Sequence, residues 1–192
     1  MDERIDLKRW LLIGIAAESL LLLGCYVNYP QPGEAFRHAA RYSGRLSLLV
    51  FLTAFGFFAY TRWKRNDAAM TKLRDLVTLF AVLHFIHLGF VAMNVRFNAI
   101  ELVPYKLAGG ALAYALVLVY PFVILRVRAR SFLHLVYFYY VGLVMALTYV
   151  ARIKGEFDGA TPDGFHIPGL CLVLVAFTAG TALLVVGRRS GA

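Results

Sequence analysis

The chain has 192 residues, 60% of them hydrophobic, and a mean hydropathy of +0.68. A water-soluble domain of this size does not carry so much apolar surface, so the composition excludes a soluble globular protein and predicts a membrane protein. The net charge of +9 would suit nucleic-acid binding. The distribution of the basic residues instead follows membrane topology, so we expect no nucleic-acid partner.

Six apolar runs follow one another, each long enough for a membrane-spanning helix. The predicted helices lie near 10–29, 44–61, 76–94, 107–125, 131–151 and 168–187. Almost no sequence remains for a soluble domain. We therefore expect one all-α, six-helix transmembrane domain over residues 1–192, with the lipid bilayer as its partner.

The basic residues predict the topology. Thirteen of the 20 Lys and Arg residues lie before the first run, after the second and fourth runs, and after the sixth. By the positive-inside rule, both termini are then cytoplasmic, in a bacterial-type inner membrane (N-in/C-in). The oligomeric state is not predicted.

The first run is predicted to be a retained helix rather than a signal peptide, because it is long, carries Glu18 and lacks a small-residue cleavage pattern. A carboxyl group at this depth is costly. Two states would reduce the cost: a protonated carboxyl bonded to a backbone carbonyl, or a pair with His84, which we place at a similar depth. Glu18 is thus a candidate supporting residue for a ligand histidine, or an alternative metal ligand.

The second run is preceded by a segment with two prolines and several arginines, which we expect to lead into the helix. Arg41 and Arg45 fall at its outer mouth. Haem propionates at a membrane boundary need cationic partners, and the guanidinium group offers a two-pronged fork for a carboxylate. The alternative is that both side chains simply extend to the membrane interface.

The third and fifth runs contain three histidines, His84, His87 and His134. Histidine within a membrane is a functional-site hypothesis by default, and its usual occupant is a haem or a metal ion. His84 and His87 share one helix flank, so they do not grip one iron from opposite sides. His134 is expected to differ from His84 by roughly 8 Å of rise. One haem between His84 and His134 and a five-coordinate haem on a single histidine both remain open.

The connection before the sixth run carries Asp158, Asp163 and His166 and is expected to be a solvated, turn-rich loop. Cys25 and Cys171 are both expected near the outer face. A disulfide and two free thiols are both compatible with the sequence.

Several segments resemble the ferric reductase-like transmembrane domain family, in particular its small stand-alone bacterial members. The similar segments are RYSGRLSLLVFLTAF, LRDLVTLFAVLHFIHL, GGALAYALVL and FLHLVYFYYVGLVMAL, between about Arg41 and Arg152. The family includes the haem subunit of the bacterial methionine sulfoxide reductase system. The resemblance implies six helices and b-type haem for electron transfer.

The family pattern places a pair of histidines in the third helix and another in the fifth, which hold two stacked haems. In this chain the pattern is incomplete. If His87 and His134 match one member of each pair, Leu73 and Thr148 occupy the missing positions, and His84 is additional. We therefore expect at most one haem b.

Three functions are consistent with these residues. The first is a haem protein for electron transfer, an oxidoreductase component if it is an enzyme; it has no flavin or NAD(P) site, so a quinone or a separate reductase must supply electrons. The second is a membrane metal site or metalloenzyme that uses His84, His87 and Glu18. The third is a haem-free scaffold or assembly partner. No catalytic residue is predicted.

Overall fold

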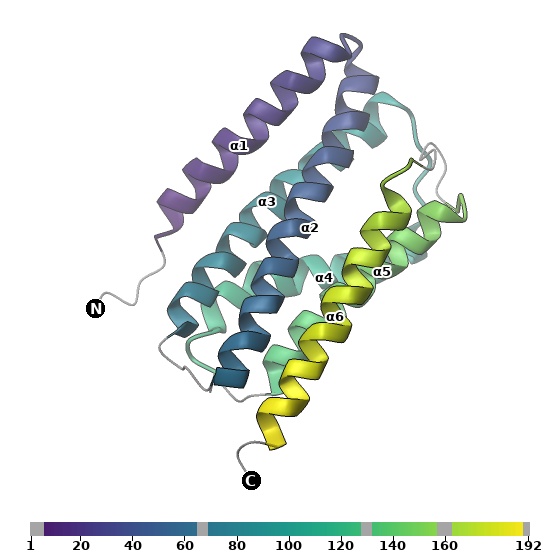
Figure 1. Cartoon of the computed structure of the whole chain (residues 1–192). Helices are drawn as coiled ribbons and strands as arrows, with labels where there is room; N and C mark the ends of the chain where they lie inside the picture. The colour runs from purple at the N-terminus through teal and green to yellow at the C-terminus, as the bar shows by residue number, and fades with distance from the viewer. Residues whose placement is uncertain (1–5, 65–68, 128–131, 157–162, 190–192) are drawn as a thin grey trace.

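The computed structural model describes residues 6–64, 69–127, 132–156 and 163–189, and these residues form helices joined by short connections (Figure 1). The elements are α1 (Leu7–Asn28), α2 (Pro32–Lys64), α3 (Met70–Phe97), α4 (Pro104–Val123), α5 (Phe132–Ile153) and α6 (His166–Arg189). The predicted all-α class and the six helices in their predicted order are confirmed. The predicted first residue of the fifth helix, Ser131, and several basic residues of the topology prediction, among them Arg4, Arg65, Arg128 and Arg130, lie outside the described residues.

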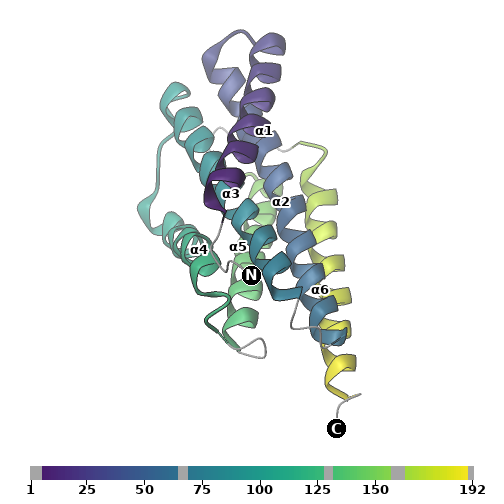
Figure 2. The same ribbon diagram turned by 90° about the vertical axis from the view of Figure 1, so that its left-hand side faces the viewer.

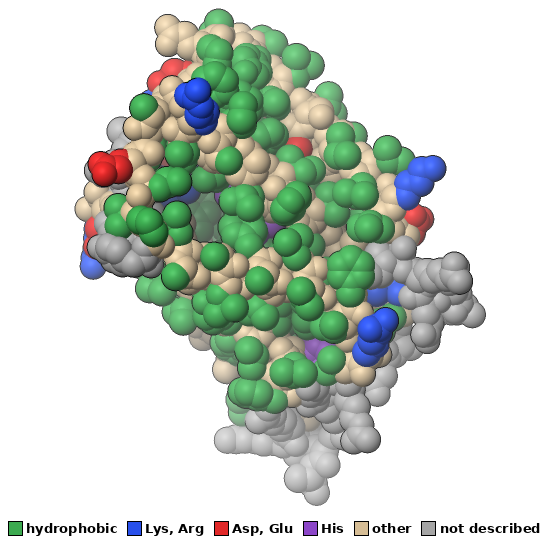
Figure 3. Space-filling view, turned by 180° about the vertical axis from the view of Figure 1, so that it is seen from behind, with side chains coloured by type: hydrophobic (Ala, Val, Ile, Leu, Met, Phe, Trp, Pro, Cys, Tyr) green, Lys and Arg blue, Asp and Glu red, His purple; other side chains and the backbone are tan. Residues whose placement is uncertain are grey.

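Within the described part of the chain, α1, α2, α3, α5 and α6 are long and apolar enough to cross a membrane. The apolar stretch of α4, Leu107–Val123, is shorter. Large apolar side chains cover much of the surface (Figure 3). Such a surface is stable where hydrocarbon rather than water is the surrounding solvent, so the protein is a multi-pass membrane protein.

The starts of α2 and α3 depart most from the prediction, and both helices begin well before the predicted residue. α2 starts at Pro32 rather than near residue 44, so the Arg-rich lead-in is itself helical. Proline suits the first helical position because its missing N–H would have no partner there. α3 starts at Met70 rather than near residue 76, which places His84 deeper into its helix than expected.

α2 and α3 are the central pair of the bundle, and the other helices pack around them. α2 packs against α1, α3 and α6, while α4 packs against α3 and α5, and α5 against α6. The C-terminal ends of α1, α3 and α5 and the N-terminal ends of α2, α4 and α6 lie toward one end of the bundle, which we call the α1–α2 end (Figure 1). The start of α1 and the end of α6 lie toward the opposite end, which we call the α2–α3 end, together with the ends of α2 and α4 and the starts of α3 and α5. Figure 2 shows that α1 and the adjoining parts of α2 and α3 extend beyond α6 at the α1–α2 end.

An aromatic core fills the bundle toward the α2–α3 end. We define it as Phe51, Phe55, Phe58, Phe80 and Phe138, each no more than 1% exposed. Their rings are in mutual contact, with centroids 4.9 Å apart between Phe58 and Phe138 and 5.1 Å apart between Phe51 and Phe80. These rings span the space between α2, α3 and α5 and leave that half tightly filled.

Candidate functional site

A polar layer lies between the aromatic core and the α1–α2 end. We define it as Glu18, Arg41, Ser43, Arg45, Ser47, His84, His87, Tyr114, Arg152, Asp163 and His166. Every helix contributes at least one member. Polar groups at such depth are costly, so their concentration in one layer marks the candidate site.

The position of His84 is fixed by a hydrogen-bond chain to α2. The Ser47 hydroxyl lies 3.1 Å from the Gly44 carbonyl oxygen, which can only accept, and 3.2 Å from Nδ1 of His84. Because the hydroxyl has a single proton and donates it to Gly44, it accepts from the Nδ1–H of His84. Nε2 of His84 then carries a free lone pair, which is the form of imidazole that ligates a metal.

The rest of the His84 ring is held by aromatic side chains. The Tyr114 ring stacks on it at 4.6 Å with an interplanar angle of 19°, and the Phe80 ring lies 5.0 Å away. The side chain is only half-buried. His84 is therefore rigidly positioned, yet it is not sealed inside the bundle.

His87 occupies a tighter position, one turn closer to the α1–α2 end. Its ring centroid lies 5.5 Å from that of His84, and it packs against Gly44, where an added Cβ would lie 3.1 Å from Cε1. The ring hydrogen-bonds to the backbone of Ala40, while Nδ1 is buried and has no partner among the described residues. His87 is thus a close neighbour of His84, with one unsatisfied nitrogen.

Glu18 does not contact His84. Its Oε1 accepts a hydrogen bond from Ser43, at 2.8 Å, and its Oε2 is buried without a partner in the described part of the chain. Of the two alternatives for Glu18, the pair with His84 is not formed, because Glu18 faces Ser43, one turn of α2 before Ser47, which is the partner of His84. A protonated carboxyl is the less costly form in this environment.

His134 belongs to the aromatic core rather than to the polar layer. It is completely buried, its Nδ1 lies 2.7 Å from the Tyr120 hydroxyl, and its ring packs beside Phe58. On α2, Phe58 is eleven residues from Ser47, the partner of His84, which corresponds to about 16 Å along the helix. This separation of their partners exceeds the expected rise of roughly 8 Å, in keeping with the earlier start of α3. It argues against one iron shared between His84 and His134.

Arg41 and Arg45 lie in the polar layer, where both face Asp163. Arg45 Nη2 lies 2.5 Å from Asp163 Oδ2, and Arg41 Nε lies 4.0 Å from the same oxygen. Burial raises the pKa of the Asp163 carboxyl, but the Phe165 N–H and the charges of Arg45 and Arg41 outweigh it, so the pKa lies below its usual value. His166 accepts a hydrogen bond from the Asp163 N–H at 3.0 Å. Asp163 and His166, which were expected in a solvated loop, therefore anchor the start of α6, whereas Asp158 lies outside the described residues.

Sequence reasoning missed Arg152, which it treated as an ordinary basic residue at the end of a helix. The side chain is half-buried and lies within electrostatic range of Arg41, Asp163, Tyr114 and Tyr149. Arg152 follows Tyr149 by three residues, which places a cation and a phenol on one face of an apolar helix, and this spacing was the available signal.

The two positions that lack the family's histidines have ordinary structural roles. Leu73 is fully buried beside the aromatic core, and the Thr148 hydroxyl donates to the Val144 carbonyl. Cys25 and Cys171 are both free thiols. Among the described residues, no group of three or more His, Cys, Asp or Glu side chains is arranged to hold a metal ion.

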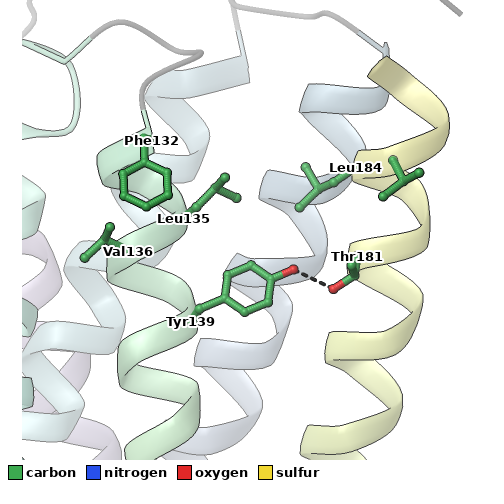
Figure 4. Close-up of a pocket in the computed structure, with 7 residues that line it drawn as sticks. Phe132, Leu135, Val136, Tyr139, Thr181 and Leu184 are labelled. Atoms are coloured by element: carbon green, nitrogen blue, oxygen red, sulfur yellow. Dashed lines mark hydrogen bonds between the residues drawn. The ribbon is translucent and has the colours of Figure 1, made fainter. Parts of the chain in front are cut away.

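A separate groove opens between α5 and α6 toward the α2–α3 end (Figure 4). It is lined by Phe132, Leu135, Val136, Tyr139, Thr181, Leu184 and Val185. Thr181 donates to the Phe177 carbonyl, so the Tyr139 hydroxyl is the donor in the bond between Tyr139 and Thr181. The groove contains none of the predicted site residues, and its lining suits lipid chains.

Comparisons with family models, with curated proteins and with solved structures find no match for this chain. The candidate site is therefore defined by its own geometry.

Proposed function

We propose that this protein is a b-type haem protein that transfers electrons within the membrane, with His84 as the axial ligand. The observation that carries the proposal is the chain from His84 to Ser47 and Gly44, which leaves Nε2 of His84 with a free lone pair. Haem-ligating histidines are commonly oriented through their other ring nitrogen in this way. The resemblance to the ferric reductase-like family supports the same cofactor.

The residues around His84 fit a five-coordinate haem better than a bis-histidine haem. His87 lies on the same helix flank, and His134 is about 16 Å away along the bundle. The half-buried position of His84 leaves its free nitrogen accessible, whereas the ring of His87 is closely packed against Gly44.

The bound group would supply one-electron exchange at its iron. The chain itself would orient the ligand through Ser47, exclude water with Phe80 and Tyr114, and provide Arg41 and Arg45 as cationic partners for propionates. Its sequence contains no Gly-rich dinucleotide motif, so electrons would come from a quinone or a separate reductase.

We propose the N-in/C-in topology for the same protein, with α4 as a sixth crossing. The described basic residues Lys8, Arg9, Arg62, Lys64 and Lys72 lie at the α2–α3 end, which would be cytoplasmic in a bacterial-type inner membrane. The polar layer would then lie toward the outer side. Cysteine labelling of intact cells, with single cysteines placed at Gly33 and at Thr71, tests this orientation.

The decisive experiment is a reduced-minus-oxidised spectrum and a pyridine haemochrome assay on the purified full chain, expressed with ample haem. We expect one b-type haem per chain. His84→Ala should lose it, while His134→Ala, the matched control from the aromatic core, should retain it if the variant folds.

Two results would contradict the proposal. Haem that survives His84→Ala would remove His84 as the ligand. Absence of a Soret band would remove the electron-transfer function. Metal analysis of the same sample would then distinguish the metal-site alternative, which predicts bound metal without haem, from the haem-free scaffold.

A further inference from the structure

The positive charge of the polar layer is not balanced by the acidic residues described there. Arg41, Arg45 and Arg152 bring three guanidinium groups near one carboxylate, that of Asp163. Asp163 is already engaged by Arg45 at 2.5 Å and by the Phe165 N–H at 2.9 Å. Glu18 is bonded to Ser43 on the α1 side of the layer. An excess of guanidinium groups over described carboxylates at this depth is costly, so the layer is suited to an additional anion.

Arg152 is the cation of the polar layer that contributes most to this excess of positive charge. Its guanidinium group forms no hydrogen bond and no ion pair with the residues of the described ranges, although the side chain is half-buried. Its nearest charged neighbour of the same sign is Arg41, which already faces Asp163. A fork of N–H donors in such a position matches the oxygen atoms of a phosphate or carboxylate group.

Two phenol groups add neutral donors beside Arg152. Tyr149 precedes Arg152 by three residues on α5, and its ring centroid lies 6.1 Å from that of His166, which is bonded to the Asp163 N–H. Tyr114, from α4, stacks on His84 and lies within electrostatic range of Arg152. Neither hydroxyl group has a hydrogen-bond partner among the described side chains and backbone groups. The rear face of the molecule is hollowed, and Lys or Arg atoms and His atoms are visible within the hollow (Figure 3). Cationic and histidine side chains are therefore accessible at an opening on this face of the molecule.

We propose that Arg152, with Arg41, Tyr114 and Tyr149, forms a binding site for one phosphate-type oxyanion. The anion is either free phosphate or the headgroup of an anionic phospholipid. Several oxygen atoms around one centre can accept from the guanidinium forks and the phenol hydroxyls together, which a halide ion cannot do with the same geometry. Arg41 is shared with the proposed propionate contacts, but the phosphate site itself needs no haem, because it follows from the charges and donors of the chain.

The test uses the full chain, purified in a neutral detergent without phosphate. Inorganic phosphate is titrated against thermal unfolding, with sodium chloride at matched ionic strength as the reference. In parallel, the protein is reconstituted with equal amounts of phosphatidylglycerol and phosphatidylcholine, and retained lipids are counted by native mass spectrometry. The first arm detects free phosphate, and the second detects a lipid headgroup.

Arg152→Gln is compared with Lys154→Gln, which removes the same charge two residues away from an exposed side chain paired with Glu156. We expect a rise in Tm with phosphate, or retention of one phosphatidylglycerol, in the wild type and in Lys154→Gln. Arg152→Gln should need about tenfold more phosphate, or should lose the lipid. Arg152→Lys keeps the positive charge but removes the paired N–H donors of the guanidinium group, and it replaces Arg152→Gln if that variant does not fold. It should bind phosphate or phosphatidylglycerol more weakly than the wild type.

The proposal is overturned if the wild type responds to neither probe, or if the Arg152 variants respond as Lys154→Gln does. Both results are independent of the haem assay. A chain that binds phosphate but no haem would retain this site and lose the proposed electron-transfer function.

Discussion

The aromatic core and the polar layer provide different environments for a histidine side chain, although several of the same helices contribute to both. In the aromatic core, His134 is completely buried, paired with Tyr120 and surrounded by packed rings. In the polar layer, His84 is half-buried and held on one nitrogen only. A histidine within a membrane protein is therefore not a site by itself. The second nitrogen and the packing around it decide whether the ring can bind a ligand.

The largest effect should come from opening the aromatic core. Phe138→Ala removes a fully buried ring that contacts Phe51, Phe55 and Phe58, so we expect a loss of about 3–5 kcal/mol in the free energy of unfolding. Phe132→Ala, on the same helix, removes a ring that is 72% exposed and should cost much less. Denaturant unfolding in detergent micelles measures both. Equal losses would show that the core is not packed as described.

The next effect tests how closely α5 and α6 approach. A Cβ on Gly142 would lie within 3 Å of three atoms of the Phe177 ring, which is itself stacked on Phe55 at 4.3 Å. Gly142→Ala should therefore destabilise the protein by about 1–3 kcal/mol. At Gly110, on α4, an added Cβ meets nothing within 4 Å.

Gly110→Ala is thus the matched control, and it should be neutral or stabilising because alanine favours the helix. The comparison uses the same unfolding midpoints. A destabilised Gly110→Ala, or an unaffected Gly142→Ala, would contradict the assigned helix contacts.

The helices of this fold could be predicted because each contains a long apolar run. The starts of α2 and α3 could not be predicted, because their first turns are polar or charged and lie outside the apolar run. Because the depth of His84 was counted from the start of α3, the error at that start made the predicted depth of His84 wrong as well. A few residues of helix length changed the separation from His134 from roughly 8 Å to about 16 Å.

The sequence predicted several residues of the candidate site, but it did not predict their hydrogen-bond and ion-pair partners. Sequence reasoning selected His84, Arg41, Arg45 and Glu18, because polar residues at depth are rare and costly. It did not find that Ser47 is the partner of His84 or that Asp163 faces the arginines. Serine and aspartate are ordinary in a helix or a loop, so only the packing of separate elements reveals their roles.

A smaller effect is expected where the polar layer fixes the His84 tautomer. Ser47→Ala removes the acceptor of the Nδ1–H, which should cost about 1 kcal/mol and allow both tautomers. Nitrogen NMR of labelled histidine should show the Nδ1–H form in the wild type and a mixture in the variant. Thr53→Ala is the control, because its hydroxyl bonds only to the Leu49 carbonyl on an exposed face. An Nε2–H tautomer in the wild type would contradict the assignment.

The smallest effect concerns Asp163 and depends on pH. Its pKa is lowered in the folded protein, so its stabilising contribution is complete above its unfolded pKa, near 3.9, and is lost as the pH falls through the lower folded value. Because the side chain is 21% exposed, Asp163→Asn should cost only about 1 kcal/mol at neutral pH. The difference in Tm between wild type and variant should stay constant from pH 7 to about 5.5 and shrink below about pH 4. His166 is present in both proteins, so its own titration largely cancels. If the difference in Tm between wild type and Asp163→Asn instead grew as the pH fell, the folded protein would hold Asp163 neutral rather than charged. Arg41 and Arg45 would then lack this carboxylate as a counter-ion.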